Sequence, residues 1–385
     1  IEANFSGGDL TSDAGLLLLR EVDKRLGLTR ELDKLLDDPR CPGRIMHQQI
    51  DLLRQRIFGL AAGYEDLNDH NSLRHDSALI TTCSVAKELA SAPTLCRLEQ
   101  RASQVEAWAM HDVLLQQFIQ SFEQPPTELI LDFDATNDPV HGEQVGRYFN
   151  GFYDEYCFLP LFVFCGSHLL TAYLRSASRD AAHNAPAVLK LLVTRLRQQW
   201  PDVRIIVRAD AGYCRPLLLS WCDRNDVDYV IGMSKNSILM TRSKLTQLEA
   251  KLDHGISGKK AVTFDEFLYS AGSWRNRQRR MIVKAEHSDL GANTRFVVTN
   301  LTDTPQVLYA EIYCARGDME NRIKEQQYLF SDRTSCHQWW PNQFRLLLSG
   351  LAYTLVNGLR RLALQDTELE NAQVNTIRLK LLKAP

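Results

Sequence analysis

The sequence predicts an α/β protein in which a mixed β-sheet follows an all-α N-terminal region. Three patterns along the 385 residues lead to this class. Leucines recur at helical spacing in residues 12–36, 46–67 and 106–123. Between residues 128 and 233, short apolar runs alternate with amphipathic stretches, as expected for a sheet covered by helices. A polar, β-rich stretch then precedes a last group of helices.

The bulk composition is that of an ordinary globular protein. The chain is 44% hydrophobic and carries a net charge of −2, which neither indicates nor excludes a nucleic-acid partner, because a basic groove can lie within a neutral total. Its nine cysteines include no CxxC pair, which predicts reduced thiols in a cytosol. The most apolar run is broken by proline and glycine, so we predict no membrane-spanning helix. The chain opens without Met or a signal peptide, which predicts a piece of a longer protein.

The elements follow in a recognisable order. Residues 1–125 are predicted to form a helical domain that closes at Pro125 and Pro126. Strands are then predicted at residues 128–136, 157–166, 168–176, 203–210 and 228–233, with helices at residues 181–200 and 216–225. Residues 234–305 are predicted to be a β-rich insertion with strands at residues 264–274, 278–288 and 294–301. A charged helix at residues 313–327 and a long amphipathic helix at residues 343–364 complete the chain.

This order is that of a ribonuclease-H-like domain, in which three strands, a helix, a strand, a helix and a strand precede a late helix. In that fold the first and fourth strands and the late helix carry acidic residues. We therefore predict a ribonuclease-H-like core in two parts, residues 126–233 and 306–385, with the insertion placed before the last catalytic helix.

Three acidic residues stand where an open α/β sheet places its functional sites. Asp134 and Asp210 end the first and fourth predicted strands, and Glu320 lies on the late helix. Buried carboxylates are costly unless they are paired or bound to a metal ion. Mg²⁺ prefers oxygen ligands, and two such ions about 3.5–4 Å apart can activate a nucleophile and stabilise the leaving oxygen of a phosphodiester. The pattern predicts phosphodiester chemistry, provided that the fold brings the three carboxylates together.

Three motifs carry a resemblance to a known family. DFDAT (132–136), RADAGYC (208–214) and Y-x2-R-x3-E (313–320) resemble the catalytic motifs of DDE transposases from bacterial insertion sequences. The pattern is most similar to the insertion-sequence 1380 family, which also shares features with residues 5–28, 63–76, 93–101, 321–327 and 376–383. The likeness therefore covers nearly the whole chain. Members usually extend beyond the position of residue 385, so a C-terminal tail is expected to follow.

The resemblance implies a reaction and its participants. Asp134, Asp210 and Glu320 would be the catalytic triad and would hold two Mg²⁺ ions, which Mn²⁺ can replace. The helical N-terminal domain, helped by the insertion, would bind double-stranded DNA at the terminal inverted repeats. Cleavage at the element's end would free a 3′-OH, which attacks a phosphodiester of the opposite strand to form a hairpin and then of target DNA. A homodimer in a synaptic complex, working on nucleoid DNA in the bacterial cytoplasm, is implied.

The resemblance also assigns DNA contacts. Tyr313 and Arg316 would contact phosphates of the transposon end. Relatives carry a lysine seven residues after the glutamate, where this chain has Gln327, and Lys324 is the nearest substitute. Related transposases hold a flipped base with a tryptophan of the insertion, which makes Trp274 a candidate. The arginines that follow it, Arg279 and Arg280, suit phosphate.

Alternatives remain open for several of these residues. Asp132 competes with Asp134, because residues i and i+2 of a strand point to the same face. Asp210 could only cap the helix that follows it. Arg316, Glu320 and Lys324 could form a surface ladder of ion pairs, and the tryptophan could pack beneath a solvated hairpin turn.

Other charged residues of the late helix, and other functions, complete the alternatives. Asp318, Arg322 and Glu325 are predicted to be solvated charges. Two other function classes use the same fold: a ribonuclease-H-like nuclease or resolvase that cuts without joining, and a domesticated DNA-binding protein that has lost the chemistry.

Overall fold

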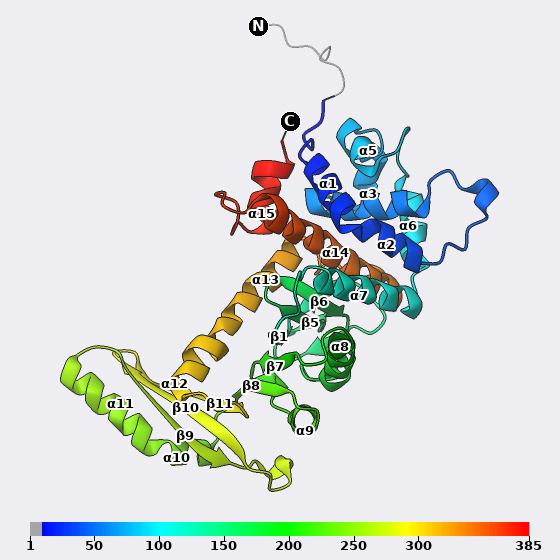
Figure 1. The fold of residues 1–385 in the computed structure, drawn as a ribbon. Coiled ribbons are helices and arrows are strands. Elements are labelled where there is room, and N and C mark those ends of the chain that lie inside the picture. Colours follow the sequence, from blue (N-terminus) through cyan, green and yellow to red (C-terminus); the bar gives the residue numbers. More distant parts are fainter. Residues whose placement is uncertain (1–9, 385) are drawn as a thin grey trace.

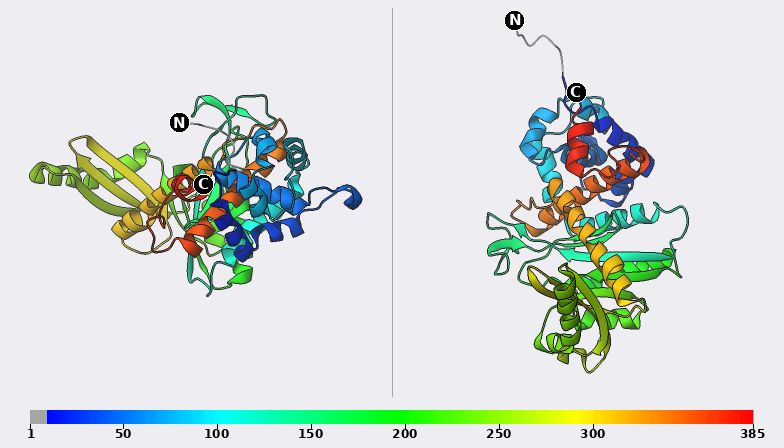
Figure 2. Two further views of the ribbon diagram at one scale, coloured as in Figure 1. Left: turned by 90° about the horizontal axis from the view of Figure 1, so that it is seen from above. Right: turned by 90° about the vertical axis from the view of Figure 1, so that its left-hand side faces the viewer.

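The computed structural model describes residues 10–384 and confirms a mixed α/β protein (Figure 1). Helices from both ends of the chain gather at one end of the molecule, a sheet crosses the middle, and residues 234–299 form the opposite tip. Helix α13 (Gly317–Tyr328) runs between the tip and the helical end. The side view in Figure 2 shows these three layers one above the other. Within residues 10–384, no helix has the length and apolarity needed to cross a membrane.

The N-terminal region is helical, as predicted. Helix α1 (Leu16–Leu26) ends at Gly27, whose positive φ of 66° lets the chain turn directly into α2 (Leu28–Leu35). Ser103 begins α7 with a capping box in which the Glu106 side chain accepts from the Ser103 backbone. The remaining helices of this region are α3 (Gln49–Ala62), α4 (His70–Leu73), α5 (Ser77–Cys83), α6 (Ala92–Gln100) and α7 (Gln104–Ile119).

The N-terminal helices share one core with the C-terminal ones. The central member is α14 (Trp339–Ala363), which packs against α1, α3 and α7. Short helical turns, α15 (Val374–Ile377) and Arg378–Leu382, follow it. Lys383 then pairs with the buried Asp13 at 2.9 Å, so segments at the two ends of the described chain lie side by side. Residues 10–125 are therefore not separated from the C-terminal helices by a boundary of their own.

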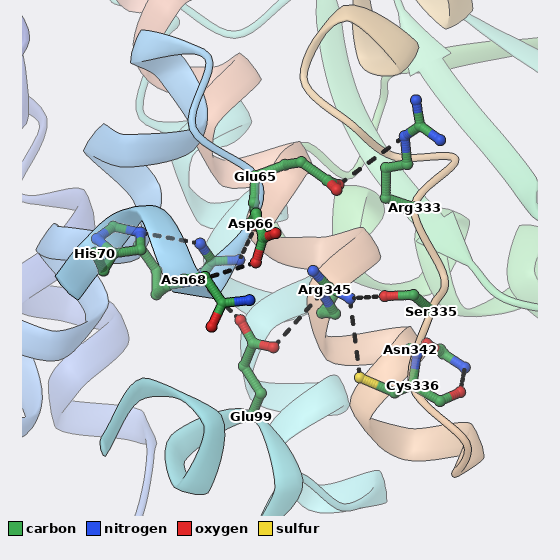
Figure 3. A network of polar contacts seen from close by, with 11 residues as sticks. Glu65, Asp66, Asn68, His70, Glu99, Arg333, Ser335, Cys336, Asn342 and Arg345 are labelled. Atoms are coloured by element: carbon green, nitrogen blue, oxygen red, sulfur yellow. Dashed lines mark hydrogen bonds and ion pairs between the residues drawn. The ribbon is translucent and has the colours of Figure 1, made fainter. Parts of the chain in front are cut away.

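A buried polar network joins these helices (Figure 3). The carboxylate of Glu99 on α6 accepts from Arg56 Nε of α3 at 2.8 Å and lies 3.5 Å from Arg345 Nε of α14. His70 Nε2 lies 3.2 Å from Arg56, and burial together with that guanidinium lowers the pKa of His70 to about 3. The histidine is therefore neutral at physiological pH, and Glu99 and the two arginines carry the charges at this point of the network.

The central sheet has eight strands in the order β6-β5-β1-β7-β8-β11-β10-β9. Strands β1, β7 and β8 run parallel, and β5, β6 and the last three strands join antiparallel. Helices α8 and α9 follow β6 and β7. The bounds are β1 (Glu128–Ala135), β5 (Leu161–Cys165), β6 (His168–Tyr173), α8 (Ala185–Gln199), β7 (Arg204–Ala209), α9 (Pro216–Arg224) and β8 (Asp228–Met233).

The insertion continues this sheet instead of building a separate one. Its three predicted strands are present as β9 (Ala261–Tyr269), β10 (Arg279–Ser288) and β11 (Gly291–Thr299). Strand β11 pairs with β8, so the hydrogen-bonded ladder passes from the core into the insertion without a break. Helices α10 (Ser237–Arg242) and α11 (Lys244–Ser257) precede the strands, and α11 packs on β9 and β10.

A smaller sheet, absent from the sequence prediction, follows β1. Strands β2 (Asp138–Pro139), β3 (Tyr148–Asn150) and β4 (Glu155–Phe158) pair in the order β2-β4-β3. The strands are only two to four residues long, which is too short for an alternating pattern to be visible in the sequence. The β3–β4 hairpin leads directly into β5.

Helix α13 is anchored by a carboxylate that the sequence analysis placed in solvent. The Glu325 side chain is only 2% exposed and pairs with Arg360 of α14. It also accepts from Arg322 at 3.2 Å and from the backbone N–H of Val374 at 2.9 Å. The prediction of a solvated Glu325 is wrong, because its position faces α14 and α15 and not water. This anchor fixes the position of the helix that carries Glu320.

Replacing Glu325 with Gln is expected to lower the free energy of unfolding by about 3 kcal/mol, because two arginines lose the charge that compensates their burial. Asp318→Asn is the matched control: Asp318 is exposed, and its one ion pair among the described residues 10–384 is with Arg322, so a change below ~0.5 kcal/mol is expected. Urea unfolding at pH 7.5 measures both. Equal effects of the two substitutions would contradict the anchoring role.

Candidate active site

Two strand-end aspartates lie at one edge of the sheet. Strands β1 and β7 are parallel neighbours with Phe133 opposite Ala209, so the residues that follow, Asp134 and Asp210, emerge at the same edge. Open α/β sheets place their sites at this carboxyl edge. The sequence therefore brings the first two predicted acids together through strand order alone.

Asp132 has a different partner. Its two oxygens accept from Arg208 Nε at 2.5 Å and Arg208 Nη2 at 2.7 Å, which makes a bidentate ion pair between β1 and β7. Both side chains are below a tenth exposed. Burial raises the pKa of Asp132, and the Arg208 guanidinium opposes that rise. A carboxylate held in this way is committed to a structural pair, and this geometry favours Asp134 as the first acid of the site.

Arg316 connects Asp134 to the third acid. Its Nη1 donates to Asp134 Oδ2 at 3.0 Å and its Nη2 to Glu320 Oε1 at 3.3 Å. Burial raises the pKa of Asp134 to about 6; Arg316 opposes the rise, and the nearby charges of Asp210 and Glu320 add to it. Glu320 itself is exposed. The three carboxylates thus share one electrostatic environment in which Arg316 supplies the positive charge.

Asp210 is fixed by its own turn and lies beside Tyr313. Its Oδ1 accepts from the backbone N–H of Gly212 at 2.9 Å and caps the short helical turn Ala211–Tyr213, the capping role that the sequence left open. A Cβ at Gly232 of β8 would lie 2.6 Å from the Tyr313 hydroxyl and 3.3 Å from the Asp210 carbonyl carbon. Glycine at this position leaves the space that Tyr313 needs to approach Asp210.

The approach to α13 is irregular, and this irregularity directs Tyr313 and Arg316. After α12 (Pro305–Val307), hydrogen bonds of π-helical spacing cover Leu308–Tyr313, and a 3₁₀ turn covers Cys314–Arg316. Such local changes of helical pitch are frequent at functional sites. Arg208 also donates to the carbonyl of Ile312 at 2.7 Å, which joins this segment to the buried pair in the sheet. The predicted continuous helix from residue 313 begins as α-helix only at Gly317.

The carboxylates of the site are the type of ligand that binds a divalent cation. Carboxylate oxygens are the ligands that Mg²⁺ and Mn²⁺ prefer. The raised pKa of Asp134 shows that its negative charge is poorly compensated, which a cation would correct. Among residues 10–384, no three His, Cys, Asp or Glu side chains are grouped closely enough to hold an ion as they stand. Arg316 is paired with two of the acids, Asp134 and Glu320.

The other predicted contacts fall into two groups. Lys324 is exposed on α13 one turn after Glu320, and Gln327 is partly exposed a further turn on. Trp274, Arg279 and Arg280 lie in the insertion, away from the carboxylates: Trp274 is 5% exposed and packs against Tyr269 and beneath Arg279. This placement favours the alternative of a tryptophan packed under a hairpin turn.

The two arginines of the insertion are also engaged within the chain. Arg279 is buried and donates to Asp223 at 2.7 Å. Arg280 pairs with Glu266 and donates to the carbonyl of Asp303 at 2.8 Å. Neither guanidinium is free to meet a phosphate in this arrangement.

The β3–β4 hairpin holds aromatic residues that the sequence analysis did not single out. Four rings in nine residues are exposed, from 44% to 87%: Tyr148, Phe149, Phe152 and Tyr156. A fifth, Tyr153, is half-buried; burial raises its pKa, and the charges of Asp134 and Asp210 add to this, which places it beside the site. Exposed rings of this kind can stack on unpaired bases. The aromatic density of YFNGFYDEY was the available signal.

Comparison with known families gives one finding. The family described as transposase DDE domain group 1 has a model that matches residues 1–385, the whole chain. No curated protein matches the sequence.

The raised pKa of Asp134 predicts a pH-dependent effect of Asp134→Asn on stability. An aspartate with a pKa of about 6 in the folded state and 3.8 otherwise destabilises the fold increasingly as pH rises through this interval, and fully above it. The asparagine variant should therefore gain ~1–2 kcal/mol relative to the wild type between pH 5 and pH 8. Urea unfolding at both pH values measures the difference.

Asp132→Asn is the control for this measurement. It leaves Arg208 buried without its counter-charge, so we expect a loss of stability at both pH values. Because burial raises the pKa of Asp132 as well, its asparagine variant is also expected to gain relative stability as pH rises, and the net loss at both pH values is what distinguishes it. No relative gain with rising pH for Asp134→Asn, or no net loss for Asp132→Asn, would contradict the assignment of the two acids.

Proposed function

Because the chain belongs to the transposase DDE domain group 1 family, we propose that it is a DNA transposase of the insertion-sequence 1380 type. It would bind the terminal inverted repeats of a bacterial insertion sequence, cut at the element's ends and join the freed 3′-OH to target DNA. The observation that carries this proposal is the link from Asp134 through Arg316 to Glu320, at the sheet edge that also holds Asp210. Three acids from distant parts of the sequence converge there.

The strand order supports a ribonuclease-H-like core. Numbered along the chain within residues 128–233, without the small sheet, the first five strands stand in the order 3-2-1-4-5, and the second joins the first antiparallel. This is the arrangement that the order of elements in the sequence predicts for such a core. In it, the first and fourth strands end at Asp134 and Asp210, beside the helix of Glu320.

Asp134, Asp210 and Glu320 would hold the divalent metal ions, with Mg²⁺ the expected species; bound there, such ions activate the attacking oxygen and stabilise the leaving one. The chain's own residues supply position and charge. Tyr313, beside Asp210, and Arg316, beside Asp134, face the place where a scissile phosphate must come. Lys324 extends the same positive face of α13 by one turn. These groups orient the phosphodiester and balance its negative charge.

Arg316 would change partners when DNA arrives. In the free protein its guanidinium neutralises two of the acids at 3.0 and 3.3 Å. A guanidinium binds phosphate in the same forked geometry as carboxylate. Transfer of Arg316 to a DNA phosphate would release both acids for metal binding, so DNA and metal would bind cooperatively.

The reaction then needs two displacements at phosphorus. Water attacks the phosphodiester at the element's end, the P–O bond to the 3′ oxygen breaks, and that oxygen leaves as a 3′-OH. The 3′-OH next attacks a target phosphodiester, forms a new P–O bond and releases the target's own 3′-OH. Because two ends must be joined to one target, we propose that the protein acts as a homodimer on double-stranded DNA.

Labelled end DNA tests the function. Wild-type protein with Mg²⁺ is expected to nick the end and join it to target DNA, and Glu320→Gln should lower both rates by at least ~10³-fold because one ligand carboxylate is lost. Binding of end DNA, measured by fluorescence anisotropy, should change by less than about threefold.

The same assay separates the other functions. A nuclease would cut without joining, and a domesticated binding protein would do neither. Joining that survives Glu320→Gln would contradict the assigned role of Glu320.

Arg316→Gln should tighten Mn²⁺ binding to the DNA-free protein by about tenfold, because a competing positive charge leaves the acids. Titration calorimetry measures this. Lys324→Gln removes the same charge from the same helix without touching an acid within residues 10–384, and should change Mn²⁺ affinity by less than about twofold. Equal affinities for Arg316→Gln and the wild type would contradict the exchange of partners.

A further inference from the structure

Helix α11 turns its large apolar residues away from the sheet that it covers. Against strands β9 and β10 it buries the small or polar residues Thr246 and Ala250. A surface helix normally turns its apolar stripe toward the sheet that it covers. Here the large apolar side chains point the other way, which indicates that the outer face has a partner of its own.

The outer face is a continuous apolar stripe. Its members are 51% to 86% exposed and recur at intervals of three, four and four residues: Leu245, Leu248, Leu252 and Ile256. At 100° per residue, all four fall within one side of the helix, opposite Thr246 and Ala250. Single exposed leucines need no explanation, but an aligned stripe marks an interaction surface.

The helix lies at the tip of the molecule, opposite the helical end (Figures 1 and 2). It packs on β9 and β10, which β8 and β11 separate from the strands β1 and β7 of the carboxylates. A partner could therefore reach the stripe without obstructing the site. The tip is joined to the core through the β8–β11 ladder, so a partner held there would be positioned relative to the whole molecule.

The charges beside the stripe select the partner. Lys244 and Lys251 flank the leucines on one side, and Glu249 flanks them on the other. None of the three forms an ion pair within residues 10–384, and all are exposed. With Leu245, Leu248 and Leu252 as the a, d and a positions of a heptad, Lys244 is a g position and Glu249 the following e position. This is the pairing that joins two parallel copies of one helix.

We propose that α11 is the docking surface for α11 of a second copy of this chain, with the two helices parallel. Lys244 of each copy then faces Glu249 of the other, which gives two symmetric ion pairs around a shared leucine seam. An antiparallel pair would instead place the lysine flank of one helix against the lysine flank of the other, which is repulsive. The self-complementary charge pattern thus fixes both the partner and its orientation.

The contact is short. The seam has three leucines, because the next d position is Gly255 and Ile256 falls at the e position beside it, and a dimer of this size in isolation is marginal. The inference rests on the proposed function for its use: two copies brought together by two DNA ends would raise the effective concentration at this surface. The interface itself is formed by residues of α11 alone.

Sedimentation equilibrium of the whole chain, without DNA and at low salt, tests the inference. The wild type should dimerise reversibly. Lys244→Glu and Glu249→Lys should each weaken dimerisation by about tenfold, and the double variant should restore it to within about threefold of the wild type. Leu248→Glu should abolish it over the accessible concentrations.

Leu217→Glu, on α9 at 76% exposure, is the control and should dimerise like the wild type. Circular dichroism and thermal melting establish that each variant is folded. A wild type that stays monomeric at ~100 μM, or a Leu248→Glu variant that dimerises unchanged, would overturn the proposal. Single reversals that the double variant does not rescue would overturn the parallel pairing.

Dimerisation is measured here without DNA or catalysis. A protein that pairs through α11 and fails to join DNA would count against the proposed function alone. A Leu248→Glu variant that stays monomeric and joins DNA at the wild-type rate would count against a role of this surface in the reaction.

Discussion

The buried ion pair between Asp132 and Arg208 is the interaction on which the site depends. It connects the neighbouring parallel strands β1 and β7. The same guanidinium donates to the carbonyl of Ile312 at 2.7 Å. The segment that leads into α13 is thereby fixed to the sheet at the point where β1 and β7 end. Because both charges are buried, neither can change partner without a large loss of free energy. Asp134 has no part in this pair and lies instead beside Arg316 of the site.

The negative charges of the site are only partly neutralised by positive charges of the chain. Arg316 neutralises Asp134 and Glu320 together, yet the pKa of Asp134 remains raised to about 6. Functional carboxylates commonly keep such unfavourable environments, because the missing interaction is supplied by the substrate or its ion. The irregular turns before α13 direct Tyr313 and Arg316 toward the acids. The absence of a side chain at Gly232 leaves room for Tyr313. The unfavourable environment of Asp134 lowers the stability of the fold and favours the binding of a cation.

Much of this could be predicted from the sequence, and the exceptions have physical causes. Apolar runs that end in acids indicate strands and their functional edge, so Asp134 and Asp210 could be placed at strand ends, whereas their common edge depends on the pairing of β1 with β7. The choice between Asp132 and Asp134 could not be made from the pattern, because both face the same way and only the position of Arg208 on the neighbouring strand separates them. Burial of Glu325 depends on helices 35 and 49 residues further along, which no local pattern reports.

The central claim is that Asp134, Asp210 and Glu320 share divalent ions when DNA is bound, while Asp132 stays in its pair. Anomalous scattering from Mn²⁺ in crystals of the protein with end DNA tests this most directly. We expect metal density in contact with all three carboxylates, with Arg316 moved onto a phosphate. Density on Asp132, or metal ions that none of the three acids contacts, would contradict it.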